Sequence, residues 1–128
     1  MSSNSFSFFR YQFPAIFWAL LIFYLSSLPH LTFPVHFWNV DKLIHLEVFF
    51  ALGILTARAF IFQGWNELLK ERVLLFTFLF VLLYGLSDEF HQYFVPGRSS
   101  DIFDALADTI GGTIAVLTIK FLPRKYLF

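Results

Sequence analysis

Four long apolar stretches, separated by short polar segments, dominate the pattern of this chain. They cover residues 12–28, 42–62, 73–92 and 102–122. Each holds 17 to 21 residues, close to the ~20 that a helix needs to cross a bilayer's hydrocarbon layer. Pro29 closes the first stretch, Gly64 interrupts the chain after the second, and Pro96-Gly97 forms a turn after the third. The pattern predicts four membrane-spanning helices.

Composition supports this prediction. Hydrophobic residues make up 58% of the 128 residues and charged residues only 14%, whereas soluble domains carry roughly 25% charged residues. We therefore expect an all-α integral membrane four-helix bundle, with residues 1–128 forming a single domain. The absence of cysteine excludes disulfides and thiolate metal sites. Zero net charge provides no field that would attract nucleic acid.

The distribution of Lys and Arg predicts the orientation. With both termini cytoplasmic, seven of the nine Lys and Arg residues lie on the inner side, and only Lys42 and Arg98 lie outside. Seven of the nine acidic residues lie on the outer side, the exceptions being Glu67 and Glu71. The ends of the helices that carry most ionisable residues are therefore expected to face away from the cytoplasm.

Polar and ionisable residues gather at these outer ends of three predicted helices, and we call them the polar cluster. An ionisable group at the bilayer centre costs about 2.5–3.5 kcal/mol on insertion scales, so their shared location is the main clue to function. The polar cluster comprises Asp41, Lys42, His45, Glu47, Asp88, Glu89, His91, Gln92, Arg98, Ser99, Asp101, Asp104 and Asp108.

Two interpretations fit the start of the second predicted helix. Asp41 and His45 are four residues apart and share a helix face. The carboxylate could orient the imidazole for proton transfer or metal binding. Alternatively, Asp41 caps the helix and His45 forms a hydrogen bond in the headgroup region. Glu47 lies on a different face and is expected to contact another helix in a structural role.

Adjacent acids end the third predicted helix. Asp88 and Glu89 could share a proton, hold a divalent cation or pair with Arg98, or they could simply emerge into water. Because the helix dipole disfavours acids at a C-terminus, we expect a compensating positive charge nearby.

The following loop supplies Arg98, whose donor fork suits carboxylate or phosphate. A phosphate there would also meet the free N–H groups that open the fourth helix; a structural ion pair with Asp88 or Glu89 is the alternative. Ser99, Ser100 or Asp101 could cap the fourth helix.

The fourth predicted helix carries a stripe of three acids, Asp101, Asp104 and Asp108. Asp108 lies roughly 9 Å inward from the start of the helix, at 1.5 Å per residue, so it needs a protein partner or a hydrated recess. Buried pairing with His45, Lys42 or Arg98 competes with a catalytic or ligand-binding role.

Small residues predict close helix packing around these groups. One row runs along the fourth predicted helix and a second along the second helix. The rows are Ala107, Gly111 and Ala115, and Gly53 and Ala57.

Taken together, these motifs resemble the VanZ-like family of bacterial membrane proteins, over residues 17–115. The motifs are Ser26-Ser27, Asp41-Lys42-x-x-His45, Asp88-Glu89-x-x-Gln92, Pro96-Gly97-Arg98-Ser99 and Asp101-x-x-Asp104-x-x-x-Asp108-x-x-Gly111. Position 108, often Asn in that family, is Asp here. The resemblance implies a protein of the bacterial inner membrane and a role in the cell envelope. The name-giving member is associated with low-level resistance to teicoplanin, a glycopeptide antibiotic.

We therefore expect an outward-facing site that binds or acts on an anionic envelope lipid or a lipid-linked cell-wall precursor. A non-catalytic protein, whose polar cluster is an ion-pair network or a lipid-binding site, is the alternative. The candidate catalytic residues are His45, Asp88, Glu89, Asp104 and Asp108. The candidate substrate-binding residues are Lys42, Gln92, Arg98 and Ser99. Structural roles are expected for Asp41, Asp101 and Gly111. If a metal binds, carboxylates favour Mg²⁺ or Ca²⁺, with Asp88, Glu89, Asp104 and Asp108 as candidate ligands.

Overall fold

The computed structural model describes residues 3–29 and 38–127, and it is helical with no strand in these ranges. The elements are α1 Ser3–Ser7, the π-helical η1 Phe8–Gln12, α2 Phe13–Ser27, α3 Trp38–Ile61, α4 Glu67–Glu71, α5 Val73–Tyr93, α6 Ile102–Phe121 and the 3₁₀ turn η2 Arg124–Tyr126. Four stretches are long and apolar enough to cross a membrane: Ser5–Ser27, Val40–Ile61, Val73–Tyr93 and Ile102–Phe121. The predicted all-α fold with four membrane-spanning helices is confirmed.

The first spanning helix begins earlier than predicted. The apolar stretch predicted a start at residue 12, but the helical backbone already runs from Ser3. The π-helical turn Phe8–Gln12 ends two residues before Pro14 and includes the carbonyl four residues before the proline. Proline lacks an N–H and its ring collides with the carbonyl four residues earlier, and a wider turn relieves this collision. The helix therefore continues through the proline.

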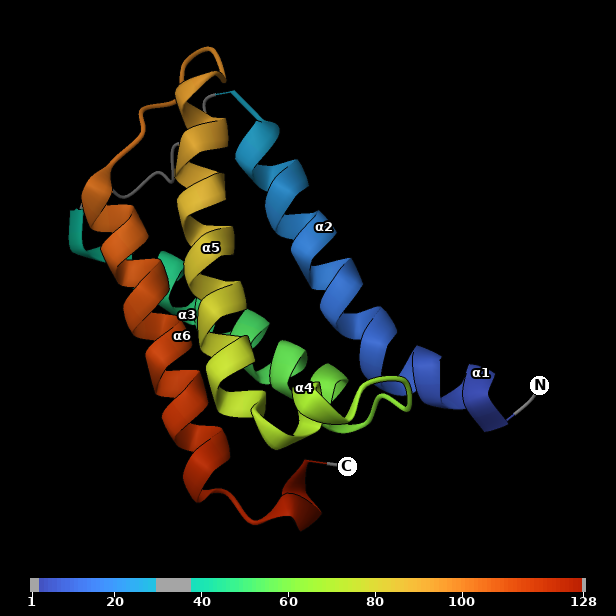
Figure 1. Ribbon diagram of the computed structural model, residues 1–128. Helices are drawn as coiled ribbons and strands as arrows, with labels where there is room; N and C mark the ends of the chain where they lie inside the picture. The colour runs from blue at the N-terminus through green and yellow to red at the C-terminus, as the bar shows by residue number, and fades with distance from the viewer. Residues whose placement is uncertain (1–2, 30–37, 128) are drawn as a thin grey trace.

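Helices α3 and α6 form the most extensive interhelical contact, and small residues allow it. Gly111 lies directly against the backbone of Leu46, and Gly53 lies against Ala115. A side chain at either glycine would collide with the neighbouring helix. The predicted packing through rows of small residues is confirmed. In Figure 1 α5 lies beside α6, with α3 passing behind both.

Helix α2 is held near its middle, and η1 before it packs on α3. The Trp18 indole Nε1–H donates to the Val48 carbonyl at 3.0 Å, and the Tyr84 hydroxyl donates to the Ala19 carbonyl. Ile22 completes this contact as part of a buried apolar cluster. Figure 1 shows α2 near α5 at their C-terminal ends and diverging from it toward α1.

Candidate functional site

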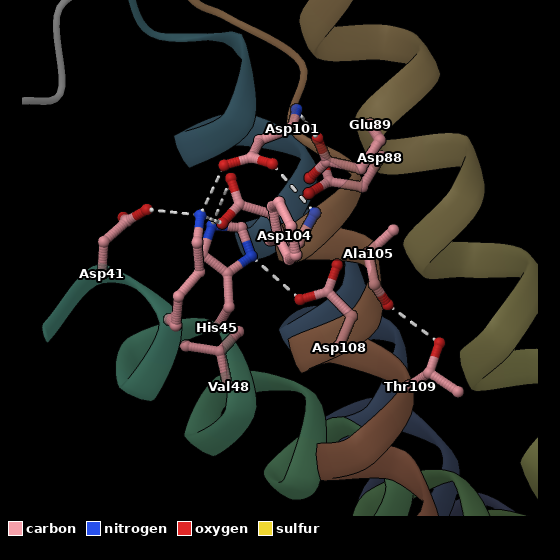
Figure 2. A network of polar contacts seen from close by, with 12 residues as sticks. Asp41, His45, Val48, Asp88, Glu89, Asp101, Asp104, Ala105, Asp108 and Thr109 are labelled. Carbon is pink, nitrogen blue, oxygen red and sulfur yellow. Dashed lines mark hydrogen bonds and ion pairs between the residues drawn. The ribbon is translucent and has the colours of Figure 1, made fainter. Parts of the chain in front are cut away.

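The polar cluster assembles where the start of α3, the end of α5 and the start of α6 meet. Figure 2 shows His45 of α3 between Asp104 and Asp108 of α6, with Asp88 and Glu89 projecting toward them from α5. Most of the polar cluster is brought together here, although Glu47 and Ser99 are exposed. The structure adds which partner each one takes.

Lys42 is the centre of an ion-pair group. Its Nζ donates to Asp101 Oδ2 at 2.8 Å, to Asp104 Oδ1, and to Asp41 Oδ2 at 3.4 Å. Only 13% of the Lys42 side chain and 8% of the Asp104 side chain are exposed. The cation predicted to bind a substrate is therefore engaged by carboxylates of its own chain.

Asp101 ties the start of α6 to this group. Its side chain caps the helix by accepting from Phe103 N at 2.9 Å. The hydrogen bond from Lys42, followed by the one from the Phe103 N–H, lowers the pKa of Asp101 below its usual value. The backbone N–H of Asp101 donates to Glu89 Oε2 at 3.0 Å, and the Ser100 hydroxyl lies 3.4 Å from the same oxygen. A single carboxylate of α5 thus supports the loop before α6.

Asp108 is fully buried and forms a pair with His45. Asp108 Oδ1 lies 2.9 Å from His45 Nδ1. When Asp108 is ionised, its carboxylate can only accept, and Nδ1 is then the donor. The other ring nitrogen, Nε2, lies 3.8 Å from Asp104 Oδ2. Gly85 of α5 provides the space, because a Cβ there would lie 3.1 Å from Asp108 Cβ. The sequence interpretation overlooked Gly85; its position three residues before Asp88 was the available signal.

Asp88 and His91 point to different neighbours. The Asp88 carboxylate is buried and accepts from Gln92 Nε2 at 3.2 Å. The His91 ring stacks on Phe23 of α2, with centroids 4.5 Å apart and planes at 10°, and its Nε2 lies 3.4 Å from Ser27 Oγ. His91 therefore belongs to the contact between α2 and α5.

A polar pocket of about 300 Å³ opens beside these groups. Its polar wall consists of Ser26, Asp41, His45, Asp88, Gln92 and Arg98, and its apolar wall includes Ile22, Leu25 and Phe49. Arg98 is half-buried and follows Gly97, whose φ of 80° makes the predicted turn. Within residues 3–29 and 38–127, no carboxylate forms an ion pair with Arg98. The alternative that Arg98 pairs with Asp88 or Glu89 is therefore wrong for this part of the chain.

A larger apolar groove, of about 540 Å³, lies deeper along the same helices. Ala15, Ala19 and Phe23 of α2 line one wall. The opposite wall comes from α3 and α5, with Phe60 and Phe80 among its residues. The polar pocket uses the next part of α2, from Ile22 to Ser26. Both hollows thus follow the gap between α2 and the remaining helices.

Comparison with known proteins identifies the family. The family model described as VanZ/LLP1 matches residues 4–123. The chain belongs to the VanZ/LLP1 family. It is also 35% identical over 106 residues to an uncharacterized protein of the fission yeast Schizosaccharomyces pombe, covering 80% of this chain. The chain spans 59% of the length of that relative. No solved structure matches the chain.

Two residues of the polar cluster of this VanZ/LLP1 protein are exposed and lie away from the pocket, whereas others belong to the buried network without being part of the pocket lining: Lys42, Glu89, Asp104 and Asp108. Glu47 is exposed on α3 instead of facing another helix as expected, because α5 and α6 cover the opposite face, where Phe49 and Leu52 are buried. Ser99 is exposed and is not among the described residues that line the pocket.

The yeast relative shows that a chain similar to this one occurs in a eukaryote.

The arrangement combines two kinds of chemistry. The carboxylate–imidazole pair of Asp108 and His45 resembles an oriented general base, and His45 is part of the pocket wall. On the same wall, Arg98 offers a rigid fork of donors without a carboxylate partner among the described residues. This VanZ/LLP1 site can therefore hold an anion beside a group able to accept a proton.

Proposed function

We propose that this protein binds an anionic membrane lipid, with the lipid phosphate at Arg98 in the polar pocket. The observation that carries the proposal is the position of Arg98, which lines the pocket. The other cation of the polar cluster, Lys42, donates hydrogen bonds to three carboxylates of its own chain. A guanidinium matches two phosphate oxygens at once. The amide of Gln92 lines the same pocket and adds donor capacity.

The apolar groove favours a lipid over a soluble anion. It begins on α2 next to the polar pocket and continues toward Ala15. A groove of about 540 Å³ with mainly apolar walls falls within the usual size of ligand pockets. An acyl chain of a lipid whose phosphate lies at Arg98 would bury apolar surface in this groove.

A thermal-unfolding experiment in neutral detergent tests this proposal. The probes are dioctanoyl phosphatidate, dioctanoylglycerol and inorganic phosphate, added to the wild type, Arg98→Gln and a control, Arg72→Gln. Arg72 is exposed at the start of α5. A ligand at 100 times its Kd stabilises a protein by about 2.7 kcal/mol.

We expect phosphatidate to raise the Tm of the wild type and of Arg72→Gln but not of Arg98→Gln. Dioctanoylglycerol, which has the same chains without phosphate, should have little effect. Equal Tm shifts in all three proteins would show that Arg98 does not take part in binding. An equal response to inorganic phosphate would identify a soluble anion as the ligand.

A second candidate function is proton transfer on the bound headgroup, and the His45–Asp108 pair favours it. Asp108 orients the imidazole and would stabilise its protonated form. Glu89, which is also buried, could act as a further base. In such a reaction His45 would take a proton from a water that attacks the phosphorus, the P–O bond to the diacylglycerol would break, and the leaving oxygen would take up a proton. Release of phosphate and diacylglycerol from phosphatidate by the wild type, lost in His45→Gln with binding retained, would support catalysis. If the wild type bound phosphatidate tightly and formed no product, the protein would be a binding protein and not an enzyme for this lipid.

The location is also part of the proposal: the polar cluster faces the extracytoplasmic side of a bacterial inner membrane. The bias of seven Lys and Arg against two supports this orientation. Because the chain has no cysteine, Ser99→Cys and Glu71→Cys provide single labels at opposite ends. An impermeant maleimide should label only Ser99→Cys in intact cells; preferential labelling of Glu71→Cys would invert the topology.

A role in glycopeptide resistance follows from the family resemblance and stays a proposal. A lipid ligand, present in bacteria and eukaryotes alike, fits the yeast relative better than a cell-wall precursor does. Bacteria that express the wild type should tolerate more teicoplanin than those that express Arg98→Gln at equal protein level. If both strains were equally sensitive to teicoplanin, resistance would not depend on Arg98 and the polar pocket.

A further inference from the structure

The polar cluster contains more negative than positive groups. Apart from the exposed Glu47, two permanent cations, Lys42 and Arg98, face six carboxylates: Asp41, Asp88, Glu89, Asp101, Asp104 and Asp108. With both His45 and His91 protonated, two carboxylates still lack a matching cation. Uncompensated charge is costly in a membrane interior. Protons or a bound cation must offset the excess.

Three of these groups converge from three different helices. His45 of α3, Glu89 of α5 and Asp108 of α6 each offer a ligand atom, and these atoms lie within 4.8 Å of one another. Ligand atoms that surround one ion at about 2.0–2.2 Å are separated by no more than twice that distance. Small side-chain movements would bring the three atoms to a common ion.

Two buried oxygens at this point lack hydrogen-bond donors. Glu89 is 6% exposed and Asp108 is 0% exposed. No described residue donates to Glu89 Oε1 or to Asp108 Oδ2. The other oxygen of Glu89 is held by the Asp101 N–H, an orienting contact of the kind found around metal ligands. The other oxygen of Asp108 lies 2.9 Å from His45 Nδ1, and an ion bound between these two side chains would replace their hydrogen bond.

We propose that His45, Glu89 and Asp108 bind a divalent cation. Two carboxylates suit Mn²⁺ and an imidazole suits Zn²⁺, so the mixed donor set fits these ions better than an all-oxygen Ca²⁺ cage. The three protein ligands leave positions open for water or a further ligand. The chain has no thiolate that could compete for the ion.

The cation would also help the polar pocket to attract an anion. His45 lines that pocket, and a wall of carboxylates alone repels phosphate. A divalent ion at His45 would add positive charge to the wall that also contains Arg98. This consequence rests on the proposed lipid binding, whereas the metal site does not and is measured without lipid.

Metal titration of the EDTA-treated full chain in neutral detergent tests the site. Mn²⁺ binding is followed by electron paramagnetic resonance, and the Tm is measured with Mn²⁺ and with Zn²⁺. The variants are Glu89→Gln and Asp108→Asn, which preserve shape and remove charge. Glu71→Gln, exposed beyond the other end of the bundle, is the matched control.

We expect one saturable ion in the wild type and in Glu71→Gln, and at least tenfold weaker binding in Glu89→Gln and Asp108→Asn. The ion should raise the Tm of the wild type, and EDTA should reverse the shift. A wild type that binds neither Mn²⁺ nor Zn²⁺ saturably would overturn the proposal, whether or not the variants fold. Equal affinity in folded Glu89→Gln would overturn it as well.

Discussion

Replacing Lys42 by methionine should destabilise the protein strongly. The substitution keeps the length of the side chain and removes the ammonium that Asp101 and Asp104 share. Asp104, whose side chain is 8% exposed, would keep a charge without its main partner. Asp101, whose side chain is 32% exposed, would be partly compensated by water.

The expected loss follows from these exposures. Removing one partner of a buried ion pair costs about 3–5 kcal/mol, whereas exposed pairs contribute about 0–1 kcal/mol. We therefore expect Lys42→Met to lower the free energy of unfolding by about 3 kcal/mol, mostly through Asp104. Asp104→Asn should cost less, because the amide still fits the site and Lys42 keeps Asp101.

Unfolding in mixed detergent micelles, for both single variants and the double variant, measures the coupling. We expect the double variant to be more stable than the sum of the single effects predicts, by about 1–3 kcal/mol. Lys70→Met is the control, since Lys70 and Glu67 form an exposed pair at 2.8 Å, worth under about 1 kcal/mol. The reasoning would be refuted if the free energy of unfolding of Lys42→Met lay within about 0.5 kcal/mol of the wild type. It would also be refuted if the effects of the two single variants added up to the effect of the double variant.

Three further outcomes can be measured by the same unfolding assay. Gly111→Ala should cost about 1–3 kcal/mol by forcing α6 away from α3, whereas Gly64→Ala, with no atom within 4 Å of the added Cβ, should change little; similar effects would contradict the packing. Lys42 lowers the pKa of Asp101, so its contribution is complete above the unfolded pKa near 4 and lost as the pH falls through the lower folded pKa. Asp101→Asn should therefore differ from the wild type at pH 7 and converge with it at strongly acidic pH; a constant difference would be inconsistent. Trp18→Phe should lose about 0.5–1.5 kcal/mol with its 3.0 Å hydrogen bond, and no loss would argue against that bond.

The spans were predictable because membrane helices depend on length and apolar content, which the sequence displays directly. The close contact of α3 and α6 was also predictable, since glycine rows such as Gly53 and Gly111 have few other uses in a spanning helix. The extension of the first helix before Pro14 was not predictable, because nothing in the sequence marks a π turn.

The partners within the polar cluster were predictable only as a set. Helical spacing gives the face on which a residue lies but not which neighbouring helix approaches it. Three cations were therefore open as partners of Asp108, and the structure selects His45. The apolar groove depends on the divergence of α2 from α5, a property of helix packing that no local pattern records.

The most direct test of the central claim, that the polar pocket holds a lipid phosphate, is native mass spectrometry in mild detergent. The wild type should retain a phosphate-bearing lipid, and so should Arg72→Gln. Arg98→Ala, with an unchanged helical spectrum, should lose it. The same lipid retained at the same occupancy by folded Arg98→Ala, or no lipid on a well-folded wild type, would contradict the account.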